Sequence, residues 1–141
     1  MLLISLSETK KKGAFTTPWT FLHFYGGFFF SLLTFGYTNI NARNSFIIYS
    51  LLHLIYECKD FYITYLSNIK ISKDSNLFGL LHKNNTLINS LGDQIFGMIG
   101  WYIGYLFFKN IKTHAHANKI TFILFIIGIL LVLLFNICRL G

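Results

Sequence analysis

The segment SFIIYSLLHLIYECKDFYITYL, residues 45–66, is long and apolar enough to cross a bilayer, yet its second half carries Glu57, Lys59 and Asp60. On a helix that turns about 100° per residue, one face collects polar and ionisable side chains within roughly 80 to 100° of one another. These side chains are Tyr49, His53, Tyr56, Glu57, Asp60 and Thr64, whereas Lys59 points elsewhere. We therefore predict a membrane-length helix with one ionisable face.

Charge inside a membrane is costly, and this segment carries more than its apolar residues offset. A charged residue at the membrane centre costs about 2.5 to 3.5 kcal/mol, whereas each Leu, Ile or Phe contributes roughly −0.3 to −0.6 kcal/mol. The apolar residues here supply about −4 kcal/mol against roughly +8 kcal/mol for three central charges. The helix therefore requires partner helices, water, protonation of a carboxyl, or a charged turn close to an interface.

The composition indicates a membrane protein, because 54% of the 141 residues are hydrophobic and only 12% are charged. We predict an all-α integral membrane bundle of about four transmembrane helices. The predicted spans are about 19–37, 45–66, 88–108 and 120–137, within a single transmembrane domain of residues 18–141. Residues 1–17 are predicted to form an interfacial N-terminal arm.

The net charge of +7 lies in the segments between the apolar runs, so it indicates topology and not binding to nucleic acid. With four spans, both termini and the loop 67–87 share one side of the membrane. That side holds seven basic residues, namely Lys10, Lys11, Lys12, Lys70, Lys73, Lys83 and Arg139. The other side holds four, namely Arg43, Lys109, Lys112 and Lys119. Both termini are therefore predicted to be cytoplasmic.

The first and third spans carry glycines that indicate close helix packing. Gly27 shares a face of its span with His23, and Gly97, Gly100 and Gly104 share a face of the third span. Small residues at this spacing let another backbone approach closely. We predict that these four glycines face protein and that the fourth span, apolar almost all round, faces lipid on most sides.

Six polar or ionisable residues of the first three spans are predicted to form one shared site, because the cost of burying them separately would be high. They are His23, His53, Glu57, Asp60, Asn89 and Asp93. A divalent metal is one candidate ligand, with His53, Glu57 and Asp93 as candidate metal ligands. The alternative is a polar core that only holds the bundle together. Residues 109–119 are predicted to be a solvated loop, in which His114 and His116 lack the further ligands of a tight metal site.

Three short motifs carry a resemblance to a known group. They are His23 with glycines one turn later, the run His53-x-x-Tyr56-Glu57-x-x-Asp60, and Asn89-x-x-x-Asp93-x-x-x-Gly97-x-x-Gly100-x-x-x-Gly104. Over residues 18 to 108 the chain resembles the VanZ-like and YjdF-like small polytopic membrane proteins, and it is distantly similar to base-exchange phosphatidylserine synthases. The resemblance implies four or more short spans with acidic positions in a helix pair.

The sequence leaves several functions open. The favoured expectation is a multi-pass membrane protein of VanZ-like type whose polar site recognises a lipid headgroup or a cation. One alternative is an enzyme that modifies phospholipid headgroups, with Glu57, Asp60 and Asp93 holding a divalent metal and His23 or His53 as base. Others are a proton or ion pathway and a structural membrane protein. The expected partners are the bilayer and its lipids, without nucleic acid.

Overall fold

The computed structural model describes residues 15–68, 86–111 and 113–140, and the regular elements in these ranges are four long helices. They are α1 (Pro18–Tyr37), α2 (Ala42–Asn68), α3 (Leu87–Phe108) and α4 (His114–Leu140). The prediction of an all-α fold is confirmed for the described residues. The predicted interfacial arm and most of the predicted loop 67–87 lie outside them.

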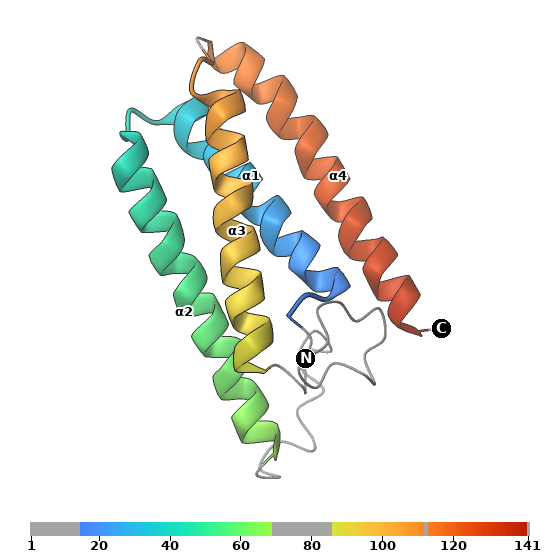
Figure 1. The fold of residues 1–141 in the computed structure, drawn as a ribbon. Coiled ribbons are helices and arrows are strands. Elements are labelled where there is room, and N and C mark those ends of the chain that lie inside the picture. Colours follow the sequence, from blue (N-terminus) through green and yellow to red (C-terminus); the bar gives the residue numbers. More distant parts are fainter. Residues whose placement is uncertain (1–14, 69–85, 112, 141) are drawn as a thin grey trace.

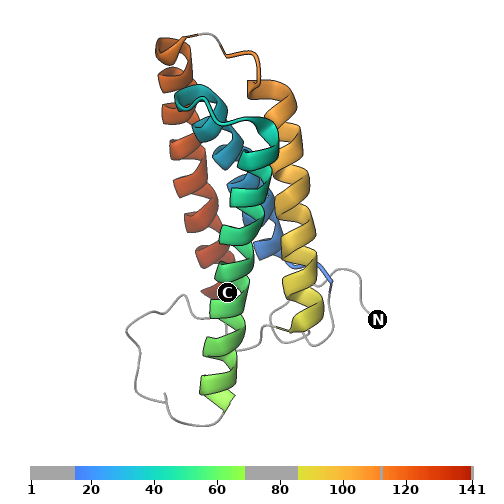
Figure 2. The same cartoon turned by 90° about the vertical axis from the view of Figure 1, so that its left-hand side faces the viewer.

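Successive helices run in opposite directions, so α1 begins at the same end of the molecule at which α2 ends, α3 begins and α4 ends (Figure 1). The principal contact joins α1 to α3. Helix α2 packs mainly against α3, and α4 packs against α1 (Figures 1 and 2). Because α1 contacts all three other helices, it is the central element of the bundle.

The contact between α1 and α3 is made through glycines. A Cβ atom at Gly100 would overlap the carbonyl oxygen of Phe24, and one at Gly27 would overlap the carbonyl oxygen of Gly97. A Cβ at Gly104 would lie 2.8 Å from the Phe28 carbonyl oxygen. The two backbones therefore touch without intervening side chains, as small-xxx-small pairs allow.

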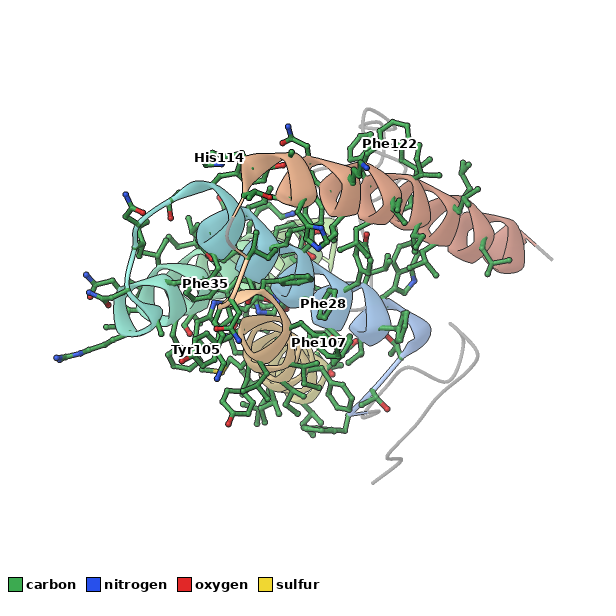
Figure 3. All side chains as sticks on the ribbon, turned by 90° about the horizontal axis from the view of Figure 1, so that it is seen from above. Phe28, Phe35, Tyr105, Phe107, His114 and Phe122 are labelled. Carbon is green, nitrogen blue, oxygen red and sulfur yellow. The ribbon has the colours of Figure 1, made fainter. Side chains whose placement is uncertain are left out.

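Aromatic side chains extend this contact at the end of the bundle where α3 finishes. Phe28 of α1 packs edge-on against Phe107 of α3 at a centroid distance of 6.0 Å, and Phe35 lies 5.2 Å from Tyr105 (Figure 3). Such ring pairs add about 0.5 to 1.5 kcal/mol each beyond the area that they bury.

A chain of hydrogen bonds joins the first three helices in the same half of the bundle. Ser31 of α1 donates to the Trp101 carbonyl (2.6 Å), the Trp101 indole donates to Ser45 of α2 (3.0 Å), and Ser45 donates to Thr34 (3.0 Å). These side chains are buried, so their polar groups are paired within the protein.

Two helices begin earlier than the sequence analysis predicts, since side chains cap them. The Asn41 side chain accepts a hydrogen bond from the Asn44 amide, so α2 starts at Ala42 and not near residue 45. The Thr113 side chain accepts one from the His116 amide, so α4 starts at His114. The prediction of a loop through residue 119 is therefore wrong in its second half, and His114 and His116 lie in the first turn of a helix.

Large apolar side chains cover the outside of the bundle. Phe122 of α4 is 68% exposed, Phe107 of α3 is 71% exposed and Ile55 of α2 is 65% exposed. Among the described helices, α4 alone contains a segment long and apolar enough to cross a membrane, His114–Leu134, and little of that segment is buried against the other helices. The rest of the four-span prediction is taken up below as a proposal.

The glycine contact allows a matched test of packing. We expect Gly100→Ala to lower the free energy of unfolding by about 1 to 3 kcal/mol, because the added methyl group forces the α1 and α3 backbones apart. Gly26→Ala is the control, since a Cβ atom there meets nothing within 4 Å. Thermal midpoints of both variants in detergent report the difference. Equal midpoints would show that the two helices do not touch at Gly100.

Candidate functional site

Two histidines and a glutamate from α1 and α2 meet in the half of the bundle where α1 begins. The Nδ1 atom of His23 lies 2.6 Å from Nε2 of His53. The Oε1 atom of Glu57 lies 3.3 Å from Nδ1 of His23 and 3.7 Å from Nε2 of His53. His53 and Glu57 are 8% and 4% exposed, so the group is largely removed from solvent.

Asp93 of α3 lies behind His23. Its Oδ2 atom is 3.6 Å from Nε2 of His23, the ring nitrogen that does not face His53. The same oxygen accepts a hydrogen bond from the Asn89 side chain (2.9 Å), and Oδ1 accepts one from the Thr20 hydroxyl. These contacts hold the carboxylate in a fixed orientation with one edge toward His23.

His53 is held by residues on two helices. Tyr49 stacks on its ring at a centroid distance of 5.5 Å, and the Gln94 side chain of α3 lies beside it without a hydrogen bond to it. The Gln94 amide donates to the Ser50 carbonyl (3.3 Å), which fixes the amide in place. Gly97 permits this arrangement, because a Cβ atom there would crowd the His53 ring at 2.8 Å.

Five of the six predicted site residues form one connected set, and the sixth, Asp60, pairs with a lysine beside them. His23, His53, Glu57, Asn89 and Asp93 form one connected set. Asp60 instead accepts from Lys59 at 2.7 Å. Its side chain lies at the edge of a cavity that His23 and His53 also line. Lys59 in turn lies over the Tyr56 ring, 3.7 Å from its centroid.

Sequence reasoning missed Thr20 and Gln94. Thr20 is three residues before His23, so the helical spacing that links His23 with Gly27 would also have placed Thr20 on that face. Gln94 follows Asp93 directly, and neighbouring helical residues point about 100° apart. No single-face pattern could have found Gln94, because it lies on the side of α3 that faces α2, where its amide donates to the Ser50 carbonyl.

The three atoms His23 Nδ1, His53 Nε2 and Glu57 Oε1 have the chemistry and spacing of a metal site. Two ligand atoms at 2.0 to 2.1 Å from a tetrahedral Zn²⁺ lie about 3.3 Å apart. The observed separations of 2.6, 3.3 and 3.7 Å surround that value, so small side-chain rotations suffice to accommodate the ion. This set differs from the predicted one, because His23 stands with His53 and Glu57 where Asp93 was expected.

The site is close to one end of the bundle. His23 is five residues after the first residue of α1, which corresponds to about 8 Å along the helix axis. Asp93 is six residues after the first residue of α3, or about 9 Å. The other half of these helices carries the paired hydroxyl groups described above.

The fold and site together define an all-α protein with a buried histidine and carboxylate cluster shared by three helices. A scan against protein-family models, a search of curated proteins and a search of solved structures each find no match.

The hydrogen bond from Asn89 to Asp93 can be tested without any bound ligand. We expect Asn89→Ala to lower the free energy of unfolding by about 1 to 3 kcal/mol, because the buried carboxylate loses a donor. Ser90→Ala is the matched control, since the neighbouring Ser90 hydroxyl is buried without a hydrogen-bond partner. Unfolding of both variants is followed by circular dichroism in detergent with a chelator present. A larger loss in Ser90→Ala would contradict the assigned role of Asn89.

Proposed function

We propose that the chain is an integral membrane protein with four spans, corresponding to α1 to α4. The support is the apolar outer surface on α2, α3 and α4, which would be costly in water. A protein interior in the membrane also explains why the described carboxylates of α2 and α3 either meet histidines and hydrogen-bond donors or, like Asp60, pair with a lysine. On this proposal the termini share one side, which the excess of basic residues assigns to the cytoplasm.

We further propose that the protein binds one divalent transition metal, such as Zn²⁺, through His23, His53 and Glu57. The observation that carries this proposal is that two imidazole nitrogens and a carboxylate oxygen from two helices lie within 4.8 Å of one another. Two histidines with one glutamate form a known three-ligand zinc set that leaves a fourth position open.

Asp93 supports the metal as an outer residue in this proposal. A histidine that binds a metal through one nitrogen commonly donates its other N–H to a carboxylate, which fixes the ring and increases its basicity. The Oδ2 atom of Asp93 faces Nε2 of His23 at 3.6 Å, so a small movement would bring the two within hydrogen-bond distance. The His23 ring thus already has its second nitrogen toward a carboxylate.

The rival functions fit the arrangement less well. A proton or ion pathway requires ionisable groups along the membrane, whereas the clustered acids and histidines lie in one half of the bundle. Polar packing alone contributes about 0.6 kcal/mol per contact, too little to offset the cost of several buried ionisable groups. A role as an enzyme remains compatible with the open fourth position. The resemblance to VanZ-like proteins is part of the proposal and rests on the three motifs alone.

The metal proposal predicts a defined stoichiometry. Protein purified in detergent, stripped with a chelator and titrated with Zn²⁺ should bind about one ion per chain by calorimetry and by elemental analysis. We expect His53→Ala and Glu57→Gln to weaken binding at least 100-fold, and Asp93→Asn to weaken it about 10- to 100-fold. Cys58→Ser serves as the background, because the Cys58 thiol is exposed and could bind zinc itself.

His116→Ala is the control for zinc binding, since His116 is exposed at the opposite end of the bundle. The His116→Ala variant should bind Zn²⁺ with the same affinity as the protein without that substitution. If His116→Ala abolished binding and His53→Ala did not, the metal would belong to the α4 terminus and the proposed site would be wrong.

The four-span proposal predicts a simple pattern of labelling. Single cysteines at Ser7 and Ser75, introduced after Cys58 and Cys138 are replaced by serine, should react with an impermeant maleimide from the same side of the membrane. A cysteine at Asn110, between α3 and α4, should react from the other side. Labelling of positions 7 and 75 from opposite sides would overturn the four-span topology.

A further inference from the structure

A groove runs beside the histidine cluster between α1 and α2, with α4 at its edge. Its volume is about 440 Å³, within the range of small-molecule sites. Trp19, Leu22, Phe30, Leu52 and Val132 give it apolar walls. His23, His53, Tyr56 and Asp60 form its polar part, so the groove is amphipathic along its surface.

A second groove adjoins the first on α1. It has a volume of about 430 Å³ and lies between α1 and α4, lined almost entirely by apolar atoms. Leu22 and Val132 line both grooves, so the two adjoin. We call the two adjoining grooves the apolar path; it follows α1 and includes His23 and His53 in its lining.

We propose that this path holds a glycerophospholipid, with an acyl chain along α1 and its phosphate at the fourth position of the metal site. The inference rests on the proposed function, since a bound divalent ion supplies the positive charge that a phosphate requires. One carboxylate and two neutral imidazoles leave the ion and its direct ligands with a net positive charge, and the negative charge of Asp93 lies on the far side of His23 from the fourth position. In a membrane-spanning bundle the two grooves would lie beside bulk lipid, so a lipid can enter sideways without leaving the bilayer.

The shape of the groove favours a lipid over a soluble phosphate compound. A soluble ligand would gain little from walls made of Leu22, Phe30 and Val132, whereas each buried methylene of an acyl chain contributes about 0.8 kcal/mol. The polar end lies about 8 Å along the axis from the first residue of α1, which places it nearer to that end of the bundle than to the middle. Trp19, at the first turn of α1, is the type of residue found at that interface.

The test compares lipids that differ only in the headgroup. Delipidated, zinc-loaded full-length protein in detergent is mixed with dioleoyl phosphatidic acid or with dioleoylglycerol, and retained lipid is counted by native mass spectrometry. Zinc per chain is measured in the same samples. We expect phosphatidic acid to bind at least tenfold tighter than dioleoylglycerol, and millimolar inorganic phosphate to displace it poorly.

Gly26→Phe is the informative variant, because Gly26 lines the groove and a side chain there meets no neighbour within 4 Å of its Cβ. It should fill the groove, weaken phosphatidic acid binding at least tenfold and leave the zinc content unchanged. Ala115→Phe adds similar bulk at an exposed position outside both grooves and should bind lipid normally.

The outcomes separate this inference from the proposed function. Normal zinc content with equal binding of the two lipids, or with full binding by Gly26→Phe, overturns the lipid inference alone. Displacement by inorganic phosphate at the concentration of the lipid identifies a soluble phosphate ligand and also overturns it. Protein that binds no zinc overturns the metal proposal, and the lipid inference falls with it.

Discussion

The backbone contact between α1 and α3 is the constraint on which the rest of the structure depends. Gly27, Gly97 and Gly100 bring the two helices close enough for Asp93 to reach His23 across the interface. On the four-span proposal the helices associate among lipid tails that are as apolar as leucine, so burial of apolar area would not drive their association. Close van der Waals packing then becomes the main attraction, and it requires residues without bulky side chains.

The polar cluster and the packing support each other. Bringing two carboxylates and two imidazoles into a low-dielectric interior is costly unless each group meets a partner of suitable charge or a donor. Thr20 and Asn89 supply donors to Asp93, and Glu57 faces both histidines. A helix displaced by a few ångströms would separate these groups, so the glycine contact also determines the electrostatics of the site.

Much of the helical arrangement could be predicted from spacing, since one residue per 100° fixes which side chains share a face. That rule placed His53 with Glu57 and grouped the α3 glycines. It could not show that the Asp60 carboxylate pairs with the neighbouring Lys59, because that pair depends on side-chain conformations and not on helical spacing. Helical spacing also could not find Gln94. It could not show that His23, and not Asp93, joins His53 and Glu57 as the third candidate metal ligand, because both results depend on how three helices approach one another.

The peripheral position of α4 has a consequence for the integrity of the site. The site residues come from α1, α2 and α3, whereas α4 packs chiefly against α1. The contacts among the histidines and carboxylates therefore do not involve α4, and loosening α4 would uncover one side of α1 while these contacts stay in place.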